Sequence, residues 1–374
     1  MRKIAAALLI EIAFALNAAA PVSAESATAN DTARFLAGLP PVANSPLAIL
    51  TQDPLWQDHA RRFNSLFSRE DSNTLSRVRA FSKEHLPDKH DTLLYFFSGP
   101  DFLFATSFFP TASTYVLAGL EPVGSIPQLT SMSMPTIEGS LRNLENSLGS
   151  LLSFSFFITK NMKAQLSDGP VYGTLPVLYV FLARTGKTLH DVAFVGLDEK
   201  GNVQVLDEPP DAGVSNQKAI RSAARGIRIV FSRESGPRQT LYYFSTNLAD
   251  SSVAHSGFLA FCERLGPADS FIKSASYLLH GSGFSRARAF LLNHSEIILQ
   301  DDSGIPFAYF DPQNWRLQAF GRYVGPISQF AHHGQPELAQ LFYKTNAVPL
   351  DFGIGYRWRR NESNLLLAVK GATN

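Results

Sequence analysis

A buried strand followed by a short helix and a second strand constrains the fold of this chain more than any other feature. Residues 92–98 (TLLYFFS) form a continuous apolar run between polar residues, which is typical of a strand buried on both faces. A turn follows at 99–101, and an aromatic helical stretch at 102–109 is closed by Pro110. The next strand is predicted at 114–120. This alternation favours an α/β fold in which helices cover sheets.

The other apolar segments continue the mixture of helices and strands. Helices are predicted at 52–67, 73–83, 138–152, 154–166, 176–184, 256–265, 270–279 and 285–292. Strands are predicted at 191–197, 202–206, 227–231, 240–245, 296–300 and 307–310, with a final hairpin over 348–358 and 364–369. The fold class is therefore α/β, with a mixed α+β arrangement as the alternative.

Two pairs of segments resemble each other in the same order along the chain. Residues 92–98 resemble 240–245, and residues 192–201 resemble 297–304. An ancient duplication of one α/β unit would explain both pairs, and so would chance similarity between apolar strands.

The domain organisation has two readings. A Pro-rich and acidic segment at 207–216 separates an N-terminal half, 25–206, from a C-terminal half, 217–374. The length equally allows a single domain over 25–374. If there are two related halves, we expect any cleft to lie between them.

The N-terminus has the three parts of a signal peptide. Arg2 and Lys3 precede an apolar run at 4–16, which Glu11 interrupts, and small residues lead to a cleavage site after Ala24. The alternative is an amphipathic N-terminal helix. No later apolar run approaches the ~20 residues that a membrane span needs. We therefore predict a periplasmic or secreted protein with no membrane span after cleavage.

Charge and cysteine content exclude several classes of function. The formal net charge is +1, and no basic cluster exceeds residues 357–360, so nucleic acid is not an expected partner. Cys262 is the only cysteine, which excludes an intramolecular disulfide and a cysteine-based zinc site. Its apolar surroundings favour a small buried side chain over a nucleophile.

Three short motifs resemble known sites but are better explained as structure. Residues 183–188 (ARTGKT) end like a phosphate-binding loop, yet Phe181 stands where that loop needs glycine, so a helix C-terminus near Lys187 is favoured. Residues 280–287 (HGSGFSRA) read as a glycine-rich break between helices rather than esterase machinery. The histidines at 332–333 have no ligand at helical spacing, so we predict no metal there.

Asp301 and Asp302 begin the segment DDSG after a predicted strand. Adjacent carboxylates attract a cation. An Asp followed by a glycine three residues later also makes a tight hairpin turn. The similar segment at 198–201 (DEKG) favours the turn.

Asp101 and Glu121 each follow a predicted strand, at 92–98 and 114–120. Open α/β sheets bind ligands in loops at the carboxyl ends of strands, so both are candidate cleft residues. A pair of carboxylates there could perform acid–base chemistry. Capping of the following helix is the favoured role of Asp101, and the two roles are compatible.

Four stretches of the chain resemble a set of uncharacterised exported bacterial proteins. They are residues 97–102 (FSGPDF), 108–110 (FFP), 119–124 (GLEPVG) and 299–306 (LQDDSGIP). The resemblance spans most of the chain after residue 24. It implies a bacterial, periplasmic or secreted setting and brings no activity.

The sequence leaves two classes of function open. The favoured one is a non-catalytic protein that binds a ligand or a protein partner of the cell envelope. The alternative is an extracytoplasmic hydrolase with Asp101, Glu121 and Asp302 as acid–base residues. No segment predicts a cofactor site or a metal site.

Overall fold

The structure is a computed structural model. It describes residues 27–87, 91–154, 170–210 and 223–371. Three predicted features lie wholly or largely outside these ranges, namely the signal peptide at 1–24, the helix at 154–166 and the linker at 207–216.

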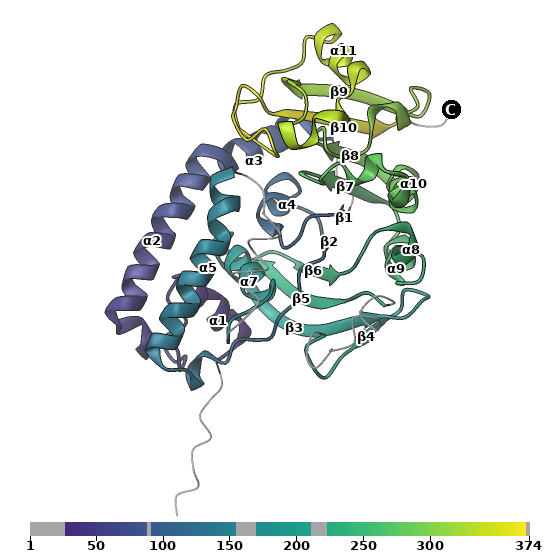
Figure 1. Ribbon diagram of the computed structural model, residues 1–374. Coiled ribbons are helices and arrows are strands. Elements are labelled where there is room, and N and C mark those ends of the chain that lie inside the picture. The colour runs from purple at the N-terminus through teal and green to yellow at the C-terminus, as the bar shows by residue number, and fades with distance from the viewer. Residues whose placement is uncertain (1–26, 88–90, 155–169, 211–222, 372–374) are drawn as a thin grey trace, which may run out of the picture.

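Ten strands form one mixed sheet in the order β4-β3-β5-β6-β2-β1-β7-β8-β10-β9 (Figure 1). The strands are β1 (Thr92–Tyr95), β2 (Thr114–Gly119), β3 (Lys187–Leu197), β4 (Val203–Val205), β5 (Arg225–Arg233), β6 (Arg238–Ser245), β7 (Ala268–Ile272), β8 (Ser295–Gln300), β9 (Trp315–Gly321) and β10 (Asn364–Lys370). The five central strands, from β6 to β8, are parallel. Antiparallel strands extend the sheet at both ends.

Helices cover both faces of this sheet, which confirms the predicted α/β class. The first face carries α1 (Ala29–Leu36), α2 (Pro54–Glu70), α3 (Ser76–His85), α4 (Phe102–Phe108), α5 (Met134–Phe154) and α7 (Leu175–Arg184). The second face carries α8 (Asp250–Val253), α9 (Phe258–Arg264), α10 (Ser285–His294) and α11 (Pro336–Lys344). Within the described ranges, no helix is both long and apolar enough to span a membrane.

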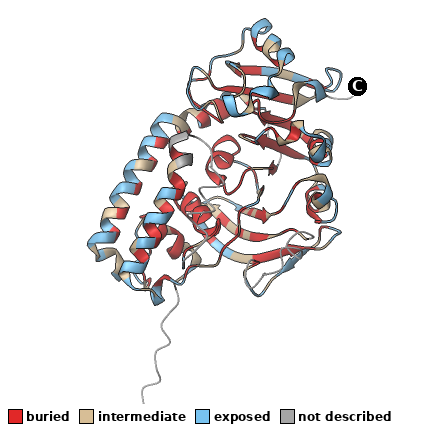
Figure 2. Cartoon of the chain, viewed as in Figure 1, coloured by how far each residue is buried: buried red, intermediate tan, exposed pale blue. Residues whose placement is uncertain are grey.

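Alternate side chains of the central strands enter two different cores. Leu93 and Tyr95 of β1 pack under the helices of the first face, whereas Leu94 and Phe96 pack under those of the second. Burial on both faces is the reason that such strands read as continuous apolar runs. Cys262 of α9 is buried in the second core, as a small apolar side chain would be. Figure 2 shows the buried sheet and the exposed outer sides of α2 and α5.

Three predicted elements are wrong. Residues 270–279 are not a helix, because β7 occupies Ala268–Ile272 and an irregular segment follows it. The expected strand at 307–310 is a short 3-10 turn, Phe307–Tyr309. The expected final hairpin does not form, since β10 pairs with β8 and β9, and residues 348–358 contribute only isolated bridges.

The strand order reverses direction at β1, which lies between β2 and β7. The connection from β1 to β2 runs through α4 on the first face, and that from β7 to β8 runs through α10 on the second. A crevice opens beyond the carboxyl ends of the strands at such a point. Strands from both parts of the chain also interleave here, because β1 and β2 lie between β6 and β7.

Candidate functional site

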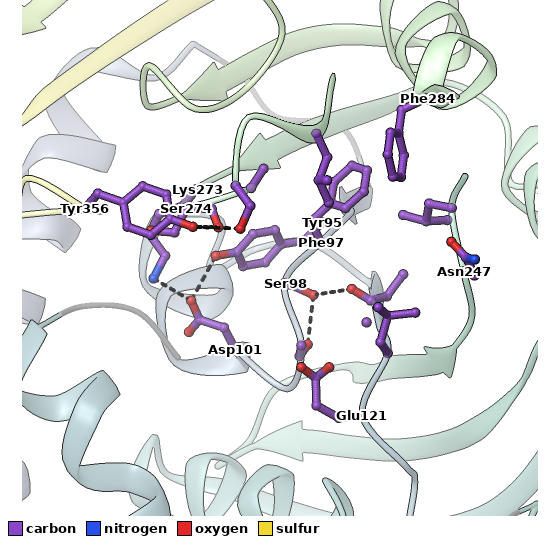
Figure 3. A pocket seen from close by; sticks show the side chains of 18 of the residues that line it. Tyr95, Phe97, Ser98, Asp101, Glu121, Asn247, Lys273, Ser274, Phe284 and Tyr356 are labelled. Atoms are coloured by element: carbon purple, nitrogen blue, oxygen red, sulfur yellow. Dashed lines mark hydrogen bonds and ion pairs between the residues drawn. The ribbon is translucent and has the colours of Figure 1, made fainter. Parts of the chain in front are cut away.

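A pocket of about 630 Å³ lies at this reversal point, and we call it the switch-point pocket. Its residues follow the carboxyl ends of four parallel strands, β1, β2, β6 and β7. Figure 3 shows its lining side chains. The wall and mouth are mainly apolar and include Phe97, Leu120, Phe284, Ile327 and Phe330. Leu120 is 55% exposed and therefore lies at the opening.

The polar floor of the pocket is organised by a buried ion pair between Asp101 and Lys273. The Lys273 ammonium lies 2.8 Å from Asp101 Oδ2, and both side chains are only 2% exposed. The Tyr95 hydroxyl donates to the same oxygen at 2.9 Å (Figure 3). The ammonium also lies 4.2 Å from the centre of the Phe104 ring, a cation–π distance.

Asp101 is held by a further bond from the helix that follows it. Its Oδ1 accepts the backbone N–H of Phe104 at 3.2 Å, which makes Asp101 the N-cap of α4. Burial, and then the nearby charge of Asp101, raise the pKa of Tyr95 well above its usual value. Tyr95 therefore keeps its proton and donates a hydrogen bond to the Asp101 carboxylate, which is already paired with Lys273.

Glu121 lies on the same pocket, at the end of β2, and is 4% exposed. Its Oε2 accepts a 3.3 Å hydrogen bond from the Tyr243 hydroxyl. The loops after β1 and β2 approach so closely here that a methyl group on Gly119 would lie 2.3 Å from Oε2 of Glu121. A methyl group on Gly99, whose φ is +55°, would lie 3.4 Å from the same atom. The structure thus places Asp101 and Glu121 on one pocket, where the first is ion-paired and the second is packed against glycine backbone.

The backbone around the pocket is unusual. Of the six non-glycine residues with positive φ in the described chain, four lie on this pocket or within its wall. They are Phe97 (φ 61°) after β1 and Ser274, Ser276 and Tyr277 (φ 52°, 52° and 55°) after β7. Such conformations cost free energy in residues with a Cβ, and they concentrate at functional sites.

Asp301 and Asp302 do not line the pocket, and they do not form the predicted hairpin turn. Gly304 N–H donates to Asp301 O at 3.2 Å, so a turn is present, but the chain then enters the Phe307–Tyr309 turn rather than a return strand. The antiparallel neighbour of β8 is β10, from much later in the chain. Pairing with β10 takes the edge that a hairpin partner would have used.

These two carboxylates instead accept hydrogen bonds from the positive-φ segment after β7, which forms a wall of the pocket. Asp301 Oδ2 accepts the Ser274 N–H at 2.9 Å, and Asp302 Oδ2 accepts the Tyr277 hydroxyl at 2.7 Å. The Ser303 hydroxyl oxygen in turn accepts the Ala275 N–H at 2.8 Å. Burial raises the pKa of Asp301 to about 6, with Asp302 as the second cause, and burial also raises the pKa of Asp302.

Lys273 is the residue of this site that sequence reasoning missed. It follows β7, in a segment where the sequence predicts a helix at 270–279, and a lone lysine between apolar residues carries no signal of a buried ion pair. Within the described ranges, no group of three or more His, Cys, Asp or Glu side chains is placed to hold a metal ion. Of the histidines at 332–333, His333 stacks its ring on that of Tyr277, with 4.9 Å between the two ring centroids.

Comparison with known proteins adds no family to this description. No protein-family model, no curated protein and no solved structure matches the chain.

Proposed function

We propose that this chain is a non-catalytic binding protein of the cell envelope that holds a small, mostly apolar molecule in the switch-point pocket. The observation that carries this proposal is a pocket of about 630 Å³ with an ion-paired floor, at the carboxyl ends of four parallel strands. Ligand sites in open α/β sheets are found at this position, and small-molecule pockets range over about 300–1,000 Å³.

The lining indicates the chemistry of the ligand. Phe97, Phe284 and Phe330 offer contact to an apolar body. The charge of Lys273 is matched by Asp101, so the floor does not require an anionic ligand. The Ser274 hydroxyl is buried without a hydrogen-bond partner among the described residues, and it would take a polar group of the ligand. We expect an uncharged or weakly polar molecule with one hydrogen-bonding end.

The hydrolase alternative has less support. Acid–base catalysis needs a carboxyl group that is free to exchange a proton with substrate. Asp101 is fixed by Lys273, Tyr95 and the N-terminus of α4. Asp302 lies behind the wall, bonded to Tyr277. Glu121 alone remains, without a second free carboxylate beside it on the pocket.

We further propose that the protein acts outside the cytoplasm, in the periplasm or after secretion. The support is the sequence of residues 1–24, with its positive start, apolar run and small-residue exit. Mass spectrometry of the protein recovered from a bacterial host tests this, because cleavage after Ala24 leaves Glu25 as the first residue. A full-length chain confined to the cytoplasm contradicts it.

A variant that blocks the mouth tests the binding proposal. We would titrate the protein with the uncharged fluorescent probe N-phenyl-1-naphthylamine and measure its dissociation constant. Leu120→Trp adds bulk at the opening, and we expect it to weaken probe binding at least tenfold. Ile49→Trp is the matched control, because Ile49 is 64% exposed and is not among the residues that line the pocket.

Equal probe affinity in the wild type and both variants contradicts the proposal, since the probe would then bind elsewhere. The hydrolase is examined in parallel with ester, peptide and glycoside substrates. Turnover that Glu121→Gln abolishes, while probe affinity is retained, would favour the enzyme over the binding protein.

A further inference from the structure

A second cavity, of about 820 Å³, lies at the opposite edge of the sheet. We call it the basic cavity. It is lined by the end of α2, by α4, by the end of α7 and by the start of β3. Lys187 begins β3 and pairs in register with Arg233 at the end of β5, beside the first residues of β6. The basic cavity therefore lies at the amino-terminal edge of the parallel strands. None of the residues that line it also lines the switch-point pocket.

The charge of this cavity is strongly unbalanced. Its cationic side chains are Arg79, Arg184, Lys187 and Arg233. Of its two acidic side chains, Asp71 is paired with Arg79 at 2.8 Å, and Glu234 is exposed to solvent. Arg184, Lys187 and Arg233 therefore line the cavity with no buried carboxylate among the described lining residues, and Arg233 donates a hydrogen bond to the Pro110 carbonyl.

Lys187 is the most deeply buried of these cations. The residue is only 6% exposed. Its ammonium group makes no hydrogen bond or ion pair with the part of the chain that the structure describes. The closest ring, Phe231, lies 5.9 Å from its ammonium group. Burial, followed by the charge of Arg233, lowers the pKa of Lys187 to about 8. Lys187 Nζ is not among the polar atoms that are closed to solvent, so the ammonium is open to the cavity that it lines, and an anion there would stabilise its charge.

Arg184 repeats the pattern with a different side chain. Its Nε and Nη2 atoms are buried and have no hydrogen-bond partner among the described residues. Nη1 makes a single long contact, 3.5 Å, with Asn64 Oδ1. The guanidinium lies 5.2 Å from the centre of the Phe67 ring, and such stacking leaves the N–H donors at its edge free. These buried donors are closed to solvent, so Arg184 contributes positive charge to the wall of the cavity rather than direct contacts to a ligand.

The motif at 183–188 contributes side chains to this cavity, not a phosphate-binding loop. Gly186 has a φ of +70° and ends α7, as its C-terminal cap position predicts. Phe181 is fully buried in the core, so the backbone does not wrap around a ligand. Arg184 and Lys187 nevertheless flank the cap and line the cavity together.

We infer that the basic cavity is a binding site for a small organic molecule that carries a phosphate group. Two or three convergent cations suit a dianionic oxyanion better than a single carboxylate. The volume of about 820 Å³ holds more than an inorganic ion, and it falls within the range of pockets that enclose a whole small molecule. This inference is independent of the ligand proposed for the switch-point pocket.

Thermal unfolding of the full chain at constant ionic strength tests this site. Inorganic phosphate and glucose 6-phosphate serve as probes, with sodium chloride as the ionic control. We expect either phosphate probe, at 100 times its dissociation constant, to raise the Tm of the wild type by about 2 °C or more. Glucose 6-phosphate should bind at least as tightly as inorganic phosphate.

Lys187→Met should raise the Tm in the absence of anion, because it removes an unpaired buried charge, and it should abolish the response to phosphate. Lys187→Arg keeps the charge and should retain the response. Arg316→Met is the matched control, since Arg316 is an exposed cation on β9 that does not line the cavity.

Three results would overturn the inference. One is the absence of any shift in the wild type, and another is an equal shift in Lys187→Met and the wild type. The third is weaker binding of glucose 6-phosphate than of inorganic phosphate, which would exclude an organic phosphate as the ligand. A loss of the response in Lys187→Met with retention in Lys187→Arg and Arg316→Met supports it.

Discussion

The two cavities at opposite edges of the sheet each contain a buried lysine, and the two lysines differ in how their charge is balanced. Lys273 in the switch-point pocket lies 2.8 Å from Asp101, which is itself fixed by Tyr95 and by α4. Lys187 lines the basic cavity together with Arg184 and Arg233. Its ammonium group makes no hydrogen bond with the described residues. The protein satisfies the first charge internally and leaves the second to a ligand.

This difference follows from where the side chains originate. Asp101 and Lys273 stand just beyond β1 and β7, which are adjacent parallel strands whose carboxyl ends meet. The cations of the basic cavity come from four elements, α3, α7, β3 and β5. An ion pair built between adjacent strands is part of the fold, whereas a cluster of convergent cations gains stability only when an anion binds.

The largest effect on stability is expected when the Asp101–Lys273 ion pair is broken. Asp101→Asn removes the carboxylate that lies 2.8 Å from the buried Lys273 ammonium and should lower the free energy of unfolding by about 3–5 kcal/mol. Lys273→Met combined with Asp101→Asn should recover most of that loss, because neither charge of the pair is then present. Urea denaturation of the single and double variants measures both. A double variant as unstable as Asp101→Asn would mean that the ion pair is not the source of the loss.

A smaller effect is expected on the unbalanced charge when pH changes. An anion favours the charged form of Lys187, whose pKa in the unoccupied protein is lowered to about 8. Affinity for sulfate, which does not titrate in this range, should therefore fall about tenfold between pH 7 and pH 9. The other charged groups that face Lys187 in the cavity are Arg79, Arg184, Arg233, Asp71 and Glu234. Isothermal titration calorimetry across this range provides the measurement.

Lys187→Arg is the control for this pH dependence, because arginine stays charged up to pH 9 and should bind sulfate with little change. If the wild type and Lys187→Arg lose affinity in parallel, another group controls the binding and the comparison between the two lysines fails.

A third effect is expected from Asp301, behind the wall of the switch-point pocket. The pKa of Asp301 is about 6 in the folded protein and near 3.8 when unfolded, so the folded state holds its proton more tightly. Its contribution to stability is present below about pH 4 and is lost as pH rises through 6. Relative to Asp301→Asn, the wild type should lose about 2 kcal/mol between pH 4 and pH 6.5.

Urea denaturation at the two pH values gives this difference directly. Glu70 has a pKa raised to about 7 by burial and adds a loss of the same sign, but it does so in both proteins and cancels in the comparison. An unchanged gap between wild type and variant at the two pH values would show that Asp301 is not the titrating group.

The sequence predicts the elements around β1 well, because they are long apolar segments with clear ends. The strand at 92–98, the helix at 102–109 and the strand at 114–120 all exist, although β1 itself ends at Tyr95. Asp101 caps α4 as its residue type favours. Local chemistry determines these features, and local chemistry is what one sequence records.

The sequence does not predict β7. For that reason it also does not predict that Lys273, which follows β7, belongs to the site. β7 has five residues and all are buried, so its pattern has neither the period of an exposed strand nor enough length to exclude a helix. The roles of Asp301 and Asp302 were missed for a related reason. Their partners, Ser274 and Tyr277, lie in the irregular segment that was assigned to the same helix. The proposed duplication and the division into halves stay predictions.

The interleaving of β1 and β2 between β6 and β7 has a consequence for the order of events during synthesis. β1 is apolar on both faces, and it has β7, from far downstream, as one of its two neighbours. Until that part of the chain is available, β1 remains an edge strand with unpaired backbone groups and no cover on its second face. Emerging N-terminal segments therefore cannot complete a stable core by themselves. The order of the strands therefore ties completion of the core around β1 to the last third of the chain, where β7 lies.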